Sequence, residues 1–508
     1  MFVLPPAAEP LIRSFAGALT RPSFARFSLL LVGAIVTFGR RTVSRILWTL
    51  GPAAATAGHP SSFHRFFSHA RWRLWPLGQI LAGAVLALLP PDAVVQLAVD
   101  DTVFAHRGKT VYGKGCHRDA VRSPHDPDRV VKKWGHKWVV LAVLVPLPFT
   151  TRRRWALPIL CALYRVPRVD QAEGRRHKTP CDLARGLVAA LLHWFPQRRF
   201  VLLGDGGFAS HDLAWFCCRH KDRLTLIARG RGDLNLHTLV SADDDQPCRQ
   251  TLWRRRTGRS CPPRCRKGPK LPAPAATVAA ARLGGGLAPG GGVLPMADVQ
   301  WYGQSRRELE LFSACGGWYR GRGHGSGALV PIRWLYTHDP QTGKQDWFLC
   351  TDPAHTHAAP AAAATPTPAP VAPAPAAIVE DFAGRWSLEV TFEEGRAHLG
   401  WETTRQRCAA SVLRCAPCLI GLFSIVTLIF IRLWRSSSSS GNGGRGACWT
   451  HHTPCYHKAE PTFADALYAV RRTLWDGCLL KHVLGPRRVT TLPRHLKRTL
   501  ITYLAEAG

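Results

Sequence analysis

Acidic side chains are scarce in this 508-residue sequence. It contains 33 Asp and Glu against 67 Lys and Arg, which gives a formal net charge of +34. Such an excess excludes strongly basic partners and favours a polyanion, of which nucleic acid is the leading candidate. A basic surface without such a partner is the alternative explanation of the charge.

A long hydrophobic run and a dense cysteine framework are also lacking. No stretch contains about 18 consecutive apolar residues, the length that a helix needs to span a bilayer. The most apolar segment, residues 419–431, has the length of a buried core helix. The 16 cysteines are scattered, which is typical of a reducing compartment. We therefore expect a cytoplasmic protein that does not contact a membrane.

Two apolar segments end on carboxylates. "AVVQLAVDD" (residues 93–101) ends on Asp100 and Asp101, and "RFVLLGDGG" (residues 199–207) contains Asp205 followed by two glycines. Uninterrupted apolar runs of this length are typical of buried strands, and ligands collect at the carboxyl ends of such strands. For a single Asp, an ordinary turn residue is the alternative interpretation.

A third carboxylate lies in an amphipathic stretch. Phe382, Arg385, Glu389, Phe392 and Arg396 are spaced three and four residues apart, which predicts that they share one face of a single helix. An arginine one turn from a carboxylate can hold it in place and contact a phosphate. A solvated Arg–Glu pair is the alternative.

Three carboxylates that converge would form a hard-oxygen site suited to Mg²⁺ or Mn²⁺. Two such ions can hold the attacking and leaving oxygens of a phosphodiester. The pattern therefore indicates metal-dependent chemistry on nucleic acid.

These motifs resemble bacterial DDE-type insertion-sequence transposases. One large group of that family carries Y-x2-R-x3-E-x6-K, and this sequence has Phe382, Arg385, Glu389 and Arg396 at the same spacings. "AVDDTVF" is similar to the first-strand block of the family and "VLLGDGGFAS" to its second-Asp block. The resemblance covers roughly residues 60–475. Phe replaces Tyr and Arg replaces Lys at two of the four signature positions.

The resemblance implies an α/β fold: an RNase H-like mixed sheet flanked by helices, with a helical N-terminal region and a mainly β insertion before the last catalytic helix. We expect residues 297–352 of that insertion to stand apart as a small β unit. The domain boundaries that it implies are a helical DNA-binding region (1–90), the first part of the catalytic core (91–231), a β-rich insertion with Pro/Ala/Gly linkers (232–376), the second part of the core with the Glu helix (377–435), a flexible linker (436–462) and a helical tail (463–508).

The resemblance also implies a site and an activity. Asp100, Asp205 and Glu389 would bind Mg²⁺ or Mn²⁺, on two strands that are adjacent and parallel. The family's D-x-T block favours Asp100 over Asp101 as the first ligand, with Asp101 beside it.

Arg385 and Arg396 would contact DNA. The expected function is cleavage and strand transfer at the ends of an insertion sequence, by a nucleoid-associated homodimer on double-stranded DNA. A catalytically inactive DNA-binding relative and a nuclease of the same fold without strand transfer are the alternatives.

Cysteine and histidine side chains near the C-terminus raise the question of zinc. The first two lead into an apolar segment, and a Ser/Gly stretch separates them from the others, so the spacing disfavours a zinc site. The residues concerned are Cys415, Cys418, Cys448, His451, His452 and Cys455.

Overall fold

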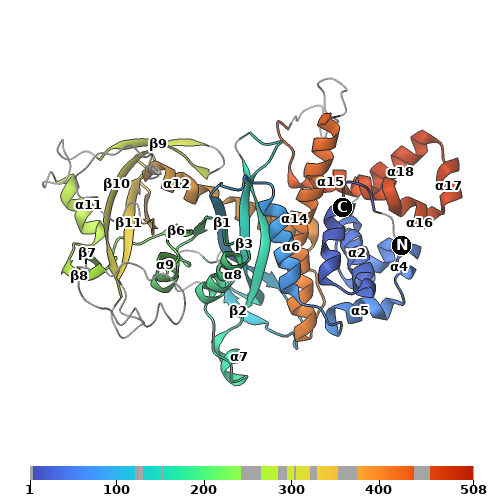
Figure 1. The fold of residues 1–508 in the computed structure, drawn as a ribbon, viewed down its shortest axis with the longest axis horizontal. Helices are drawn as coiled ribbons and strands as arrows, with labels where there is room; N and C mark the ends of the chain where they lie inside the picture. Colours follow the sequence, from blue (N-terminus) through green and yellow to red (C-terminus); the bar gives the residue numbers. More distant parts are fainter. Residues whose placement is uncertain are drawn as a thin grey trace. The chain divides into compact units, whose positions relative to one another are not determined.

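The computed structural model describes residues 4–119, 123, 130–151, 153–241, 265–283, 294–302, 305–320, 329–352, 375–439 and 458–506. Contacts divide the chain into two compact units (Figure 1). Unit 1 consists of Met1–Pro90, Asp101–Thr179 and Ser387–Gly508, and unit 2 of Pro91–Asp100 and Pro180–Trp386. Each unit is therefore built from segments that are far apart in the sequence.

Long apolar strands form the sheet of unit 1. β3 (Lys132–Pro146) pairs antiparallel with β4 (Arg154–Tyr164), and the short β2 (Gly115–Arg118) pairs with the start of β3. All side chains of β3 from Trp138 to Val145 are buried. Both faces of this strand are therefore covered, as its uninterrupted apolar run predicts.

Unit 1 also contains helices, of which α14 (Ala409–Ser439) is long and apolar. They are α1 (Glu9–Ser14), the 3₁₀ turn η1 (Phe15–Ala18), α2 (Arg21–Val36), α3 (Val43–Leu50), α4 (Pro52–Ala55), α5 (Pro60–Ser68), α6 (Leu74–Leu86), α7 (Pro167–Ala172), α13 (Ser387–Leu399), α14 (Ala409–Ser439), α15 (Phe463–Leu474), the π-helical η5 (Trp475–Leu479), α16 (Leu480–Leu484), α17 (Pro486–Thr491) and α18 (Arg494–Glu506).

Helix α14 has the length and composition of a membrane span, with a mean hydropathy of 2.2 in its most apolar window. That window is 78% buried inside the protein. The helix packs against β4, α2, α5, α6 and α15, and Ser424 Oγ donates to the carbonyl of Pro158 at 2.6 Å. The prediction of a buried core helix at residues 419–431 is confirmed.

Unit 2 begins with parallel strands. The first half of β1 (Val95–Ala105) pairs parallel with β5 (Phe200–Gly204), and β5 pairs parallel with β6 (Leu224–Arg229). Helix α8 (Pro180–Trp194) precedes β5, and α9 (His211–Cys218) connects β5 to β6. These crossovers place helices against the sheet, as parallel strands require.

The same sheet continues into the region that we predicted as a β-rich insertion. β12 (Gln345–Cys350) pairs antiparallel with β6, and the order continues through β11 (Leu329–His338), β10 (Arg306–Tyr319), β7 (Leu236–Ser241) and β8 (Cys265–Lys270). β9 (Met296–Gln300) pairs with β10, and the region also contains α11 (Pro274–Arg282). The prediction that residues 297–352 stand apart as a small β unit is therefore wrong, because β12 extends the sheet at β6.

Strand β1 takes part in both units. Its neighbours are β3 on one edge and β5 on the other, with β4 beyond β3 and β6 beyond β5. An antiparallel β3–β4 pair, a strand β1 and two following parallel strands separated by helices make the RNase H-like mixed sheet that the sequence predicts. The predicted α/β class, with flanking helices, is confirmed.

Candidate active site

Asp100 and Asp205 occupy equivalent places on two adjacent strands. Val99 is the register partner of Gly204 across the parallel β1–β5 pair. Asp205 follows the last residue of β5, whereas Asp100 follows Val99 inside β1, which continues to Ala105 and so does not end on its carboxylates as predicted. Side chains at matching positions of parallel neighbours point to the same face of a sheet. The prediction of adjacent, parallel Asp-bearing strands is confirmed within unit 2.

The turn after β5 fixes the carboxylate of Asp205. Its Oδ1 accepts from the backbone amide of Gly207 at 2.9 Å and from that of Phe208 at 3.3 Å. A Cβ on Gly207 would lie 3.1 Å from the same oxygen, and a Cβ on Gly204 would lie 2.8 Å from Cβ of Phe208. The two glycine positions therefore let the chain turn closely around the carboxylate.

A buried arginine holds Asp100. Arg385 Nη1 donates to Asp100 Oδ2 at 2.6 Å, and the side chains are 8% and 16% exposed, respectively. One helical turn before Arg385, Asp381 accepts a hydrogen bond from Gln96, which lies on the same face of β1 as Asp100. Helix α12 (Pro375–Gly384) is thus fixed to this face of β1 at two points.

Sequence reasoning missed the Gln96–Asp381 contact. A polar Gln96 inside an otherwise apolar strand was the available signal, since a buried amide needs a hydrogen-bond partner.

Asp101 lies on the other face of β1. Lys137 Nζ, on β3, contacts its Oδ2 at 2.8 Å. Successive residues of a strand point to opposite faces, so Asp101 does not share the face that carries Asp100 and Asp205. This geometry favours Asp100 as the functional carboxylate of the pair.

The single helix predicted from Phe382 to Arg396 is wrong. α12 ends at Gly384, Arg385 and Trp386 form a turn, and α13 begins at Ser387. Phe382 and Arg385 belong to unit 2, where the Phe382 ring packs 4.8 Å from that of Phe348. The amide of Arg385 donates to the carbonyl of Phe382, which closes α12. The two halves of the motif therefore belong to different helices and different units.

Glu389 lies in the first turn of α13, in unit 1, and its side chain is exposed. The neighbouring Leu388 and Phe392 are buried, so α13 directs its apolar side into unit 1. Across all the residues that the structure describes, no group of three or more His, Cys, Asp or Glu lies close enough to hold a metal ion. The structure brings Asp100 and Asp205 together in unit 2 and places Glu389 in unit 1.

Arg396, near the end of α13, contacts protein groups of unit 1. Its Nη2 donates to Thr102 Oγ1, and its Nε lies 3.3 Å from Glu402 Oε1, which Lys133 also contacts at 3.1 Å. The side chain remains 39% exposed. Arg396 thus ties α13 to the second half of β1 while keeping part of its guanidinium in solvent.

Asp100 and Asp205 supply some, but not all, of the ligands that a divalent metal needs. Asp100 and Asp205 supply hard carboxylate oxygens from one face of two neighbouring strands, and Mg²⁺ or Mn²⁺ could take both as ligands. Both carboxylates are held by protein donors, one by an arginine and one by backbone amides. A complete site needs a further oxygen ligand.

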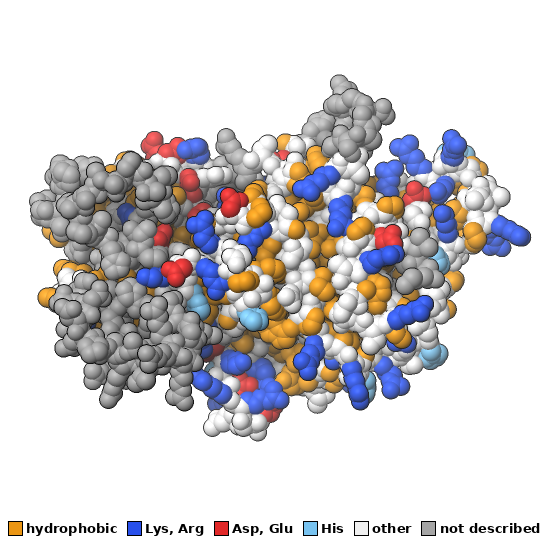
Figure 2. Space-filling model, in the orientation of Figure 1, with side chains coloured by type: hydrophobic (Ala, Val, Ile, Leu, Met, Phe, Trp, Pro, Cys, Tyr) orange, Lys and Arg blue, Asp and Glu red, His pale blue; other side chains and the backbone are white. Residues whose placement is uncertain are grey.

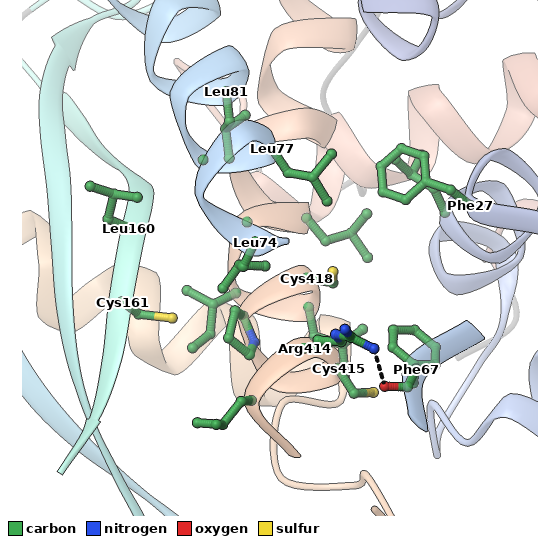
Figure 3. A pocket seen from close by; sticks show the side chains of 18 of the residues that line it. Phe27, Phe67, Leu74, Leu77, Leu81, Leu160, Cys161, Arg414, Cys415 and Cys418 are labelled. Carbon is green, nitrogen blue, oxygen red and sulfur yellow. Dashed lines mark hydrogen bonds between the residues drawn. The ribbon is translucent and has the colours of Figure 1, made fainter. Parts of the chain in front are cut away.

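The cavity in unit 1 is a different feature. It has a volume of about 760 Å³, and its lining contains Leu, Phe and Trp side chains but no carboxylate (Figure 3). Arg414 crosses it to donate to the carbonyl of Phe67 at 3.0 Å. Because the lining offers no acid or base beside a nucleophile, the cavity does not qualify as a hydrolytic site.

Two cysteines of the unfavoured zinc cluster line this cavity. Burial raises the pKa of the Cys415 thiol, and it raises that of Cys418 to about 12, so both stay protonated. A zinc ligand must be a thiolate, which this environment disfavours. Cys448, His451, His452 and Cys455 lie outside the described residues.

A known protein family matches this sequence. The family model described as DDE superfamily endonuclease matches residues 14–307, more than half of the chain. The matched range includes Asp100 and Asp205 and ends before Glu389. No curated protein matches the chain.

Solved structures also match. One is the cryo-EM structure of a piggyBac transposase synaptic complex with hairpin DNA, with 12% identity, coverage of 96% of this chain and 76% of that one, and a TM-score of 0.38. An identity and a TM-score this low do not indicate a function.

Proposed function

Because the chain belongs to the DDE superfamily endonucleases, we propose that it is a transposase. It would cleave DNA at the ends of an insertion sequence with Mg²⁺ or Mn²⁺ and then join the freed 3′ ends to target DNA. The observation that supports this most is the placement of Asp100 and Asp205 on adjacent parallel strands, inside the range that the family model matches.

Asp100, Asp205 and Glu389 would hold the metal. The chemistry that they would gain from the ion is activation of a water and compensation of charge on the phosphodiester oxygens. Asp205 is pre-oriented by the Gly207 and Phe208 amides, and Asp100 by Arg385. Carboxylates held in this way lose little entropy when they take up a ligand, which is the purpose of such supporting contacts.

Glu389 is the third ligand of this proposal. It lies in the first turn of α13, and the residue is exposed to solvent. Leu388 and Phe392, buried on either side of it in the sequence, hold the helix in place. The support for Glu389 is therefore its exposure on a firmly packed helix, together with the sequence signature.

The two arginines of the signature take different roles in this proposal. Arg385 is buried against Asp100 and acts mainly as a positioning residue. Arg396 keeps an exposed edge and can contact a phosphate while Thr102 holds it. Replacement of Arg396 by Gln should reduce the slope of log K against log[salt] for DNA binding by about 1, the value for one phosphate contact.

The net charge supports DNA as the partner. The positive excess is +34, and Figure 2 shows many Lys and Arg side chains and few acidic ones over the part of unit 1 that contains α16–α18. We propose a cytoplasmic, nucleoid-associated protein that acts as a homodimer on double-stranded DNA.

The decisive experiment compares Asp205→Asn and Glu389→Gln with wild type. Asn keeps an oxygen that can accept from the Gly207 amide, so the turn survives while the negative charge is lost. Both variants should lose Mg²⁺-dependent cleavage by at least about 10²-fold, since removal of one charge-stabilising group costs about 10²–10³, and both should bind DNA nearly as wild type.

Asp212→Asn is the matched control. Its carboxylate lies on α9 and contacts Arg320 at 3.1 Å, and the variant should cleave normally. Cleavage by Asp205→Asn at the wild-type rate would contradict the proposal. Strand transfer is measured separately with pre-cleaved ends: cleavage without joining would identify a nuclease, and DNA binding without either reaction a catalytically inactive relative.

A further inference from the structure

Helix α3 exposes a tryptophan almost completely. Trp48 is 80% exposed, whereas Val43, Ile46, Leu47 and Leu50 of the same helix are buried. The apolar side of α3 is therefore already covered by unit 1, and Trp48 is directed away from it. Its large aromatic face is therefore open to contact with a partner.

Three arginines line a pocket at the N-terminus of the same helix. This pocket, of about 570 Å³, is lined by Phe38, Gly39, Arg40, Thr42, Arg45 and Arg405. Arg45 precedes Trp48 by three residues, so the two side chains lie on neighbouring positions of one helical face. All three arginines are exposed, and none forms an ion pair with any residue that the structure describes. Like charges converge here without a protein counter-ion, which favours an anionic ligand.

The positive surface extends toward the β2–β3 hairpin. Burial lowers the pKa of His106, and the charges of Arg405 and Lys114 lower it further, so both cations lie near this imidazole. Lys114 Nζ lies 5.3 Å from the ring centre of Trp134, a second exposed tryptophan. A second pair of a cation and an exposed aromatic ring thus lies in unit 1 outside the pocket.

We propose that the surface formed by Arg40, Arg45, Trp48 and Arg405, the α3 surface, holds DNA. The arginines contact backbone phosphates, and Trp48 stacks on an unpaired base next to the duplex. The choice of DNA among polyanions rests on the proposed function. Arginine suits phosphate because of its fork of donors, and an aromatic ring stacks on any base that is not already stacked.

A membrane surface fits these residues less well. An interfacial helix binds lipid through a continuous apolar face. The apolar face of α3 is buried in unit 1, so the helix offers a lipid surface Trp48 but no continuous apolar face. Isolated aromatic rings among cations correspond to bases and phosphates rather than to acyl chains.

The first test removes the arginines. The triple variant Arg40→Gln/Arg45→Gln/Arg405→Gln is made in the full chain, in an Asp205→Asn background so that cleavage does not obscure binding. For a random-sequence duplex, the slope of log K against log[salt] should fall by about 3, one for each phosphate contact. The unfolding temperature should be unchanged because the three side chains are exposed. If the triple variant is destabilised, the three single variants are measured instead, and each should reduce the slope by about 1.

The matched control is Arg175→Gln/Arg231→Gln/Arg306→Gln. It removes the same charge from exposed arginines that pair with Glu173, Asp233 and Asp298, respectively. Its slope should stay within about 1 of wild type. Equal slopes for the two triple variants would overturn the proposal, because total charge rather than the α3 surface would then determine binding.

The second test addresses Trp48. Trp48→Phe keeps an aromatic face, whereas Trp48→Leu keeps only apolar bulk. On a duplex with a single-stranded tail, Trp48→Leu should bind about tenfold more weakly than wild type and Trp48→Phe nearly as well, since only an aromatic ring stacks on the unpaired base. On a blunt duplex the two variants should be equal. Wild-type binding of the tailed duplex by Trp48→Leu would refute the stacking role.

Two further outcomes are informative. If anionic vesicles or an acidic protein bind more tightly than DNA, and lose that binding in the arginine triple variant, the surface serves another partner and the proposal is wrong. If wild type binds DNA through these arginines but never cleaves it with Mg²⁺, the proposed function fails and the α3 surface stands.

Discussion

Arg385 Nη1 donates to Asp100 Oδ2 at 2.6 Å, and both side chains are largely withdrawn from solvent. The contact joins the residue that follows α12 to the middle of β1, within unit 2. It neutralises one of the two carboxylates that lie at matching positions of the neighbouring β1 and β5. In the absence of metal, this pairing reduces the repulsion between Asp100 and Asp205.

Replacement of Arg385 by Gln should destabilise the protein. A charged hydrogen bond to a mostly buried carboxylate is worth about 1.5–3 kcal/mol, and its loss leaves Asp100 with less compensation for burial. Urea unfolding measures the change. Arg306→Gln is the control, because Arg306 pairs with Asp298 at 2.7 Å on an exposed surface, where a pair contributes about 0–1 kcal/mol. Equal losses in the two variants would show that burial does not strengthen the Arg385 contact.

The two neighbouring aspartates should differ in their effect on cleavage. Asp100→Asn should abolish it, because Asp100 shares a sheet face with Asp205. Asp101→Asn should retain most of it and lose only the half-buried pair with Lys137, worth about 0–1 kcal/mol. Cleavage assays on both variants decide the assignment. The reverse result, an inactive Asp101→Asn and an active Asp100→Asn, would make Asp101 the ligand.

Gly395→Ala should destabilise unit 1. A Cβ at this position of α13 would lie 2.6 Å from Cδ2 of Trp401, whose ring is fully buried and donates from Nε1 to the carbonyl of Leu419 at 2.9 Å. Overpacking against a fixed ring costs about 1–3 kcal/mol, measured by urea unfolding. Gly186→Ala in α8 is the control: nothing lies within 4 Å of its Cβ, so the change should stabilise the helix by about 0.5–1 kcal/mol.

Stability should fall in mild acid because of two buried histidines. Burial lowers the pKa of His117 to about 4, and the charge of Lys137 adds to this shift. Burial likewise lowers the pKa of His136 to about 4, and the charge of His106 adds to it. The unfolded chain titrates near 6.5, so between about pH 6.5 and 4 it binds more protons than the folded chain, and stability decreases as the pH falls. Above that window both states are neutral, and below it both are charged, so these groups add no further pH dependence there.

His136→Gln tests this dependence. Glutamine keeps a donor for the carbonyl of Tyr112, which His136 Nε2 contacts at 2.8 Å, but does not titrate. The pH dependence of the unfolding free energy in that window should flatten by about one proton. Substitution of the exposed His495 on α18 serves as the control. An unchanged pH profile for His136→Gln would assign the acid sensitivity to carboxylates instead.

Part of the site could be predicted from the sequence because it depends on local pattern. Uninterrupted apolar runs before Asp100 and Asp205 predict buried strands, and buried strands separated by helices predict parallel neighbours. The pairing of Val99 with Gly204 agrees with that reasoning. The sequence also predicted the long buried β3 and the core helix that became α14.

Other features could not be predicted in this way. The three-and-four spacing from Phe382 to Arg396 continues unchanged through the turn at Arg385 and Trp386, so periodicity alone does not report the break; Gly384 was the local hint. Alternating residues predicted β12 as a strand but not its partner, since pairing with β6 joins residues more than a hundred positions apart. Such pairings depend on the packing of the whole sheet rather than on local propensity.

The discontinuity of unit 1 affects its synthesis on the ribosome. Leu77, Leu81 and Val85 of α6 bury their side chains in a unit that includes α14, which begins at Ala409. More than 300 residues separate the two helices in the chain. At roughly 5–20 residues per second, the nascent α6 waits about 15–65 s before α14 is made. Throughout that interval the N-terminal apolar surface lacks its final partner, so the yield of folded protein should depend on translation speed across residues 87–408 and on chaperones that shield this surface.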